Sequence, residues 1–144
     1  MNTHTNANTN LTSFDNQTPQ RIACTLMSAL FLISGIRKLM TWSATAGYFA
    51  ALGLPLPGVV VPLVILLEIG GPVVLIIGWR RREVAAILAV YTLLTAFVAH
   101  RFWSADPAQF NPQLNNFFKN IAMVGGFLLL IAAPARRTRN QAAD

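Results

Sequence analysis

Apolar residues run along this chain in four long stretches, separated by short polar or basic connections. The stretches cover residues 21–42, 59–79, 83–103 and 117–134. Each is close to the roughly 20 residues that a helix needs to cross a hydrocarbon core about 30 Å thick. The pattern therefore predicts an all-α fold, a four-helix transmembrane bundle.

The connections predict further elements on one side of this bundle. Residues 43–58 hold Tyr48 and Phe49 before a Leu-Pro-Leu-Pro run, which indicates a short interfacial helix ended by Pro55. Residues 104–116 form a second polar connection, which contains Pro107 and Pro112. Both segments are long enough to cap the bundle.

The two ends of the chain differ from the apolar middle. Residues 1–20 are rich in Asn and Thr and predict a disordered polar tail. Residues 21–134 form the predicted membrane domain, and residues 135–144 form a short basic tail. The domain organisation is therefore one membrane unit between two tails.

Basic residues predict the orientation of the bundle. Arg80, Arg81 and Arg82 fill the second connection, and a further Arg cluster at 136–139 follows the fourth stretch. An even number of crossings puts both clusters on one side, which the positive-inside rule makes cytoplasmic. Both termini are then cytoplasmic. Four basic residues fall on the other side against this rule: Arg37, Lys38, Arg101 and Lys119.

Composition supports a membrane protein and excludes other classes. Hydrophobic residues make up 54% of the 144 residues and charged residues 11%, whereas a soluble domain carries about 25% charged residues. The net charge of +6 does not indicate nucleic acid, because the basic residues lie at the ends of apolar runs. The predicted partner is the lipid bilayer. Cys24 is the only cysteine, so we expect no disulfide and no thiolate metal site, and we interpret Cys24 as a packing residue.

Glu68 lies in the middle of the second apolar stretch. A charge there costs about 2.5–3.5 kcal/mol on insertion scales, so its side chain should face the bundle and not lipid. Two readings stay open: an interhelical hydrogen-bonding group, or a proton-handling or ligand-binding group. Tyr91 and Thr95, one turn apart, are expected to donate hydrogen bonds between helices.

Four other polar residues lie about one turn inside the ends of their helices, on the side of the long connections. They are Lys38, His100, Lys119 and Asn120. We predict that they can share a ligand-binding or proton-handling site with Glu68, although each also has a plain role as a cap or interfacial anchor. A metal is not expected, because one histidine and one distant carboxylate are too few ligands.

The ordered motifs of the chain resemble those of the DoxX family of small bacterial membrane proteins. The matching segments are Ser34-Gly35-Ile36-Arg37-Lys38, Gly53-Leu54-Pro55, Leu67-Glu68-Ile69-Gly70-Gly71, His100, and Phe118-Lys119-Asn120 ahead of Gly125-Gly126. The resemblance implies a four-helix bundle in the bacterial inner (plasma) membrane. It also implies a redox setting, because the family takes its name from a subunit of a thiosulfate:quinone oxidoreductase. The five candidate residues occupy its polar motif positions.

The first functional hypothesis is an accessory or quinone-interacting subunit of a membrane redox or stress-response system. The sequence has no cysteine pair, haem-attachment motif or Gly-rich nucleotide loop, so it predicts no intrinsic cofactor and no self-contained enzyme. A quinone would be borrowed, with His100 or Lys38 donating to a carbonyl oxygen, and with redox partner subunits or a second copy of the chain. The alternatives are a small proton-coupled transporter and a membrane scaffold with no small-molecule site.

Overall fold

The computed structural model describes residues 17–133, and these residues are almost entirely helical. Four long helices are apolar enough to span a membrane: α1 (Gln17–Met40), α3 (Pro57–Ile77), α4 (Arg81–Ala99) and α5 (Pro107–Ala132). A short helix, α2 (Trp42–Ala51), follows α1, and a 3-10 turn, η1 (Phe102–Ser104), precedes α5. The predicted all-α, four-span fold is confirmed.

Two helices begin four or more residues earlier than the sequence predicts. Helix α1 begins at Gln17, so the last four residues of the predicted polar tail are helical, and the remainder of that tail lies outside the described residues. Helix α5 begins at Pro107, ten residues before the predicted span. Pro107 occupies the first turn, where its missing N–H needs no partner. Most of the predicted second connection is therefore the first part of α5. The basic tail, 135–144, also lies outside the described residues.

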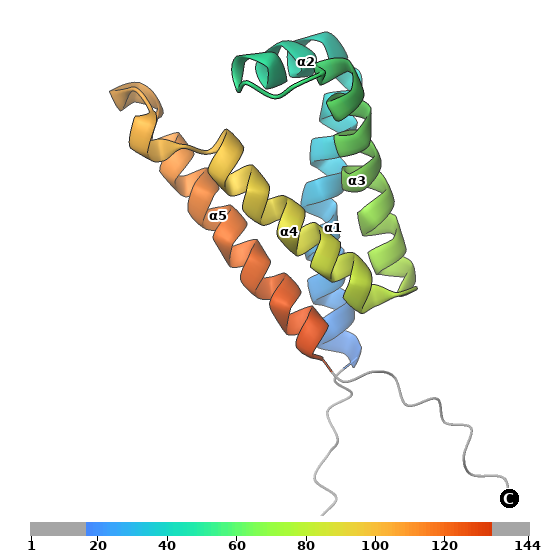
Figure 1. Cartoon of the computed structure of the whole chain (residues 1–144). Helices are drawn as coiled ribbons and strands as arrows, with labels where there is room; N and C mark the ends of the chain where they lie inside the picture. Colours follow the sequence, from blue (N-terminus) through green and yellow to red (C-terminus); the bar gives the residue numbers. More distant parts are fainter. Residues whose placement is uncertain (1–16, 134–144) are drawn as a thin grey trace, which may run out of the picture.

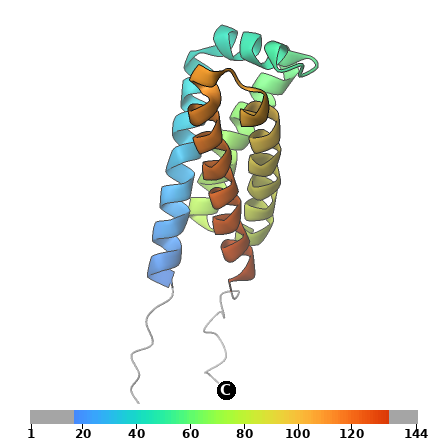
Figure 2. The same ribbon diagram turned by 90° about the vertical axis from the view of Figure 1, so that its left-hand side faces the viewer.

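The predicted short helix in the first long connection is confirmed as α2, which lies across one end of the bundle (Figures 1 and 2). It ends at Ala51 and not at Pro55, because Gly53 adopts a φ of 79° and turns the chain. The N–H of Leu54 donates back to the carbonyl of Phe49 at 3.0 Å. Phe49 itself is buried against α3 and fixes α2 on the bundle.

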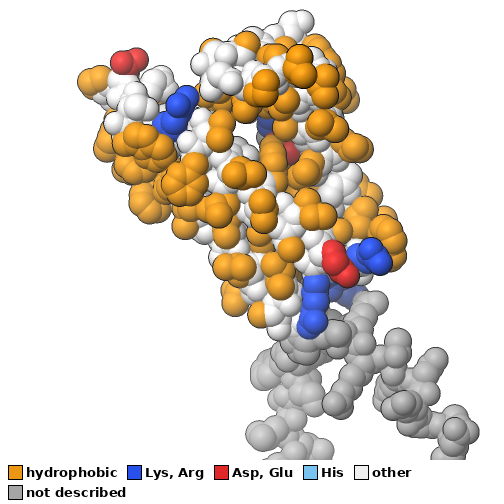
Figure 3. All heavy atoms as spheres, viewed as in Figure 1, with side chains coloured by type: hydrophobic (Ala, Val, Ile, Leu, Met, Phe, Trp, Pro, Cys, Tyr) orange, Lys and Arg blue, Asp and Glu red, His pale blue; other side chains and the backbone are white. Residues whose placement is uncertain are grey.

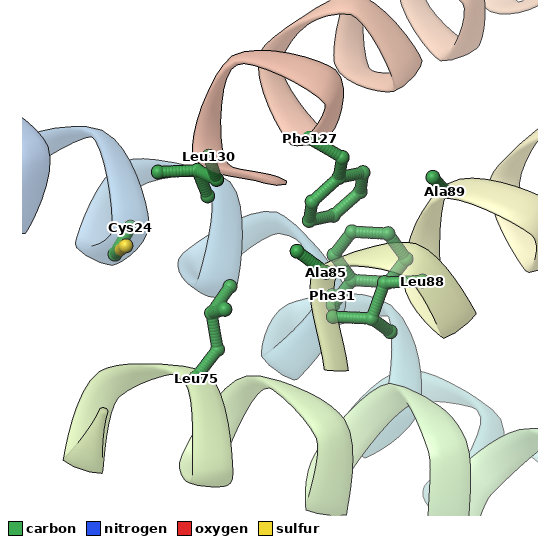
Figure 4. Close-up of a cluster of buried hydrophobic side chains, with 8 residues drawn as sticks. All are labelled: Cys24, Phe31, Leu75, Ala85, Leu88, Ala89, Phe127 and Leu130. Carbon is green, nitrogen blue, oxygen red and sulfur yellow. The ribbon is translucent and has the colours of Figure 1, made fainter. Parts of the chain in front are cut away.

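The long helices pack as two pairs, α1 with α3 and α4 with α5. Figure 1 shows the pairs close together where α1 begins and α5 ends, and apart toward α2. Buried apolar side chains fill the close end, which we call the packed end (Figure 4). Phe127 of α5 lies 5.8 Å from the ring of Phe31 of α1. Cys24 belongs to this core with 2% of its surface exposed, as its interpretation as a packing residue requires.

The outward surface of the four long helices is apolar. Exposed side chains include Leu26, Leu66 and Leu129, with 68%, 68% and 75% of their surfaces accessible. Figure 3 shows apolar side chains covering the length of the molecule on the face it presents. A water-soluble protein rarely exposes so large an apolar area, whereas lipid tails cover it without cost. This surface is the one that a bilayer surrounds.

Candidate functional site

Glu68 is held by an ion pair between the two helices of the first pair. Its side chain is buried on α3, and Lys38 of α1 places Nζ 2.9 Å from Oε1 and 2.8 Å from Oε2. The Lys38 ammonium also donates to Ser34 Oγ at 2.6 Å. The three acceptors of these bonds match the three N–H donors of a lysine. The sequence predicted that Glu68 faces the bundle, and this is confirmed.

A third helix closes this network. The Tyr91 hydroxyl of α4 donates to Glu68 Oε1 at 2.5 Å, so the carboxylate accepts hydrogen bonds from α1 and α4 together. The expectation that Tyr91 bonds between helices is confirmed. The same expectation for Thr95 is wrong, because its hydroxyl donates to the Tyr91 carbonyl of its own helix at 2.9 Å. A Thr hydroxyl within a helix commonly bonds the carbonyl one turn earlier.

Gly35 allows α1 to lie close enough for the ion pair. A Cβ at this position would lie 3.1 Å from Glu68 Cβ and only 2.7 Å from Ile69 Cγ1, a distance that real Cβ atoms essentially never show. The helices therefore touch beside Glu68. Ser34 and Lys38, four residues apart, lie on one face of α1, and this contact directs that face toward α3.

A cavity of about 680 Å³ lies between the two helix pairs on the α2 side of the packed end. We call it the central cavity. Figure 3 shows the hollow, with an acidic and a basic side chain inside it. All five candidate residues line the cavity: Lys38, Glu68, His100, Lys119 and Asn120. Apolar side chains such as Leu30, Val64 and Val98 form much of the remaining wall.

The structure divides the five residues into two groups. Lys38 and Glu68 contact each other on one wall, whereas His100, Lys119 and Asn120 come from α5 and the end of α4. Among residues 17–133, no hydrogen bond joins the two groups. His100 Nδ1 lies 2.9 Å from Oε1 of Gln113, a partner that the sequence reading missed because it expected a loop there. Since an amide oxygen accepts, Nδ1 is the donor and Nε2 is left for other contacts.

Helix α2 and α4 meet at the mouth of the central cavity. The hydroxyl of Tyr48 donates to the carbonyl of Ala99 at 3.2 Å. Partial burial raises the pKa of Tyr48, and nearby Arg101 opposes this with a smaller effect. The hydroxyl therefore stays protonated and keeps its donor at neutral pH. Over residues 17–133, no group of three His, Cys, Asp or Glu side chains is placed to hold a metal.

These features define a small four-span membrane protein with a polar network inside one half of its bundle. The chain belongs to the DoxX family, whose sequence model matches residues 22–101. It is 34% identical over 110 residues to the inner membrane protein YphA of Escherichia coli (strain K12), covering 76% of each chain. It is 40% identical over 111 residues to the inner membrane protein YqjF of the same organism, covering 76% of this chain and 78% of the relative. No solved structure matches the chain.

The relatives and the fold together establish the cellular setting. Both relatives are named as inner membrane proteins, and each alignment covers about three quarters of the chain. The four apolar helices are long enough to span a bilayer. This protein is therefore a multi-pass inner-membrane protein of the DoxX family.

Proposed function

We propose that the protein binds a quinone-type ring in the central cavity, as an accessory subunit of a membrane redox or stress-response system. The observation that carries the proposal is the cavity of about 680 Å³, within the roughly 300–1,000 Å³ typical of small-ligand sites. Its wall combines apolar side chains with a few polar groups, as a flat apolar ring with two carbonyl oxygens requires.

The polar wall formed by α5 supplies the contacts to the ring. Lys38 is occupied, since its ammonium already donates to Ser34 and both oxygens of Glu68. This argues against Lys38 as the donor that the sequence suggested. The amide of Asn120 and the ammonium of Lys119 line the cavity, and in the described part of the chain neither has a hydrogen bond. We assign them to the carbonyl oxygens. The sequence suggested that His100 donates to a carbonyl oxygen, but the contact of Nδ1 with Gln113 argues against this role. When the imidazole is neutral, Nε2 is an acceptor and suits the hydroxyl of a reduced quinone, a quinol.

Ligand binding by the purified protein tests this proposal. Menadione, a methyl-naphthoquinone, would be titrated into nanodiscs carrying wild type, Asn120→Ala or His100→Ala, at equal folded amounts. Asn115→Ala is the matched control, because Asn115 is exposed on α5 and does not line the cavity. We expect saturable binding that Asn120→Ala weakens about tenfold, a typical loss for one buried hydrogen bond, and that Asn115→Ala leaves unchanged. His100→Ala should have a smaller effect than Asn120→Ala, because menadione has no hydroxyl to donate to Nε2. Absence of saturable binding in wild type would refute the quinone site.

A small proton-coupled transporter is the second candidate, and the Lys38–Glu68 pair is the observation that favours it. Protonation of Glu68 would release Lys38 at the wall of the cavity, which links proton uptake to a change in charge there. The apolar core at the packed end closes the route on the other side. Substrate-dependent proton flux into liposomes, lost in Glu68→Gln, would support transport, and intact flux in that variant would exclude this coupling.

We further propose that both termini are cytoplasmic. The beginning of α1 and the end of α5 lie at the same end of the bundle (Figure 1), next to Arg80. Arg81 and Arg82, which the sequence assigned to the connection, form the beginning of α4 at this end. Maleimide labelling of intact cells tests this with Glu83→Cys and Ser104→Cys, exposed positions at opposite ends of α4. The native Cys24 is buried and contributes little background. If both termini are cytoplasmic, an impermeant reagent should label Ser104→Cys and not Glu83→Cys. Labelling of Glu83→Cys but not Ser104→Cys would refute this orientation.

A further inference from the structure

Basic side chains gather at the end of the bundle where the positive-inside rule does not place them. Arg37, Lys119 and Arg101 lie toward the end of the bundle where α2 lies, opposite the packed end and Arg80–Arg82. Figure 3 shows basic side chains at the edge of the hollow and within it. Because membrane insertion favours Lys and Arg on the cytoplasmic side, cations at the other end need a different reason.

The charges that line the central cavity do not balance. Glu68 is its acidic residue among residues 17–133, and it is neutralised by Lys38 at 2.8 Å. Arg37 on α1 and Lys119 on α5 also line the cavity, from its two sides, and neither is in a salt bridge within the described chain. The wall therefore carries an excess of two positive charges.

A smaller cavity of about 280 Å³ adjoins this wall between α1 and α2. It shares Arg37 and Lys38 with the central cavity and adds the hydroxyl-bearing residues Thr41 and Thr45. The Thr41 hydroxyl already donates to the carbonyl of Arg37 at 2.8 Å, so Thr45 is the residue whose hydroxyl can turn toward a negative group near the Arg37 guanidinium. Hydrogen bonds to a charged acceptor are stronger than those to a neutral one.

We infer that the ligand of the central cavity is an anionic amphiphile, with an apolar body between the helix pairs and an ionised group between Arg37 and Lys119. This inference deepens the proposed function, and it rests on that function only for the assumption that the apolar body is a ring. Within the quinone class, it selects rings that carry an ionised hydroxyl over neutral rings. The excess positive charge attracts such anions and repels cationic compounds of the same shape.

Two naphthoquinones of nearly equal size test the inference. Menadione is neutral, and in lawsone a hydroxyl that is ionised at neutral pH replaces the methyl group. Binding of each would be measured in nanodiscs of uncharged lipid for wild type, Arg37→Gln, Lys119→Gln and the control Arg101→Gln. Arg101 is a cation at the same end of the molecule that does not line the cavity. Arg37 and Lys119 are exposed, so their variants should fold.

We expect wild type to bind lawsone on the order of tenfold more tightly than menadione. Arg37→Gln should lower lawsone affinity about fivefold and change menadione affinity by less than about twofold. Lys119→Gln should lower the affinity for both rings, because Lys119 also contacts a carbonyl oxygen, and the affinity for lawsone should fall further. Arg101→Gln should change either affinity by less than about twofold. Equal affinity of wild type for the two rings would overturn the inference while leaving the quinone site standing.

Decanoate, an anionic amphiphile without a ring, tests whether the anionic site exists even if the quinone proposal fails. If decanoate binds with the same dependence on Arg37 and Lys119 while neither ring binds, the anionic site stands and the quinone proposal fails. Binding of none of the three probes would overturn both.

Discussion

Removing the charge of Glu68 should destabilise the bundle mainly by leaving Lys38 without its counter-ion. Over the 2.8 Å between Nζ and Oε2, Coulomb's law gives an attraction of about 6 kcal/mol at an effective dielectric constant of about 20. The desolvation of both groups offsets part of this attraction. We therefore expect Glu68→Gln to lower the free energy of unfolding by about 2–3 kcal/mol, because Gln still accepts from Lys38 and Tyr91 through one oxygen.

Lys38→Met should cost more than Glu68→Gln. The Glu68 side chain is 5% exposed and the Lys38 side chain 22%, so an isolated carboxylate is farther from water than an isolated ammonium. The double variant Lys38→Met/Glu68→Gln removes both charges and should be about 2 kcal/mol more stable than the sum of the two losses predicts.

Unfolding of the purified protein in mixed detergent micelles, followed by circular dichroism, gives these free energies. Glu83→Gln is the matched control, since Glu83 is exposed in the first turn of α4 and should change stability by less than about 1 kcal/mol. Additive losses in Lys38→Met and Glu68→Gln would refute the argument, because they would mean that the two side chains do not interact in the membrane.

Three further substitutions test the packing around the site by the same unfolding assay. Gly35→Ala should lower the free energy of unfolding by about 1–3 kcal/mol, because the added methyl group forces α1 away from α3. Gly125→Ala is the control and should be nearly neutral, since its added Cβ would have no neighbouring atom within 4 Å. Equal effects of the two substitutions would contradict the close approach of α1 and α3. Tyr91→Phe should cost about 1.5–3 kcal/mol through the lost bond to Glu68, and an unchanged stability would mean that this bond contributes nothing. Phe127→Ala should lower the free energy of unfolding by about 2 kcal/mol through lost contacts at the packed end. An unchanged stability of this variant would mean that these core contacts do not stabilise the bundle.

Hydropathy predicts the four spans because each needs one long apolar run, but it does not predict where α5 begins. The first ten residues of α5 mix Asn and Gln with two prolines and lack a long apolar run, a composition typical of a connection. These residues are helical in the structure, where they make tertiary contacts that cannot be predicted from the local sequence. Phe102 of η1 stacks edge-to-face with Phe110 and Phe117 of α5, at centroid distances of 6.0 and 5.3 Å. These contacts place the first turns of α5 against the end of α4.

The candidate residues could be identified from sequence, but their partners could not. A charge in an apolar run has to face the bundle, which is why Glu68 was identifiable. Its pairing with Lys38 depends on how α1 is rotated, and that rotation is set by the contact of Gly35 with α3. The role of Gln113 depends on α5 being helical ahead of the membrane span.

The hydrogen bonds of the network lead to one further prediction about the ligand. Lys38, Glu68 and Tyr91 bond to one another and to Ser34, so they shape one wall of the cavity, while Asn120 on the other side has a free amide in the described chain. A residue whose donors are already used affects binding through the shape of the site more than through direct contact. Lys38→Met/Glu68→Gln, which removes both charges of the pair, should therefore keep menadione affinity within about threefold of wild type, whereas Asn120→Ala should lose about tenfold. The titration is done in nanodiscs on samples matched for helix content. If the double variant loses menadione binding while remaining folded and Asn120→Ala keeps it, the ring contacts the ion pair directly, and the assignment of the α5 wall as the binding surface is wrong.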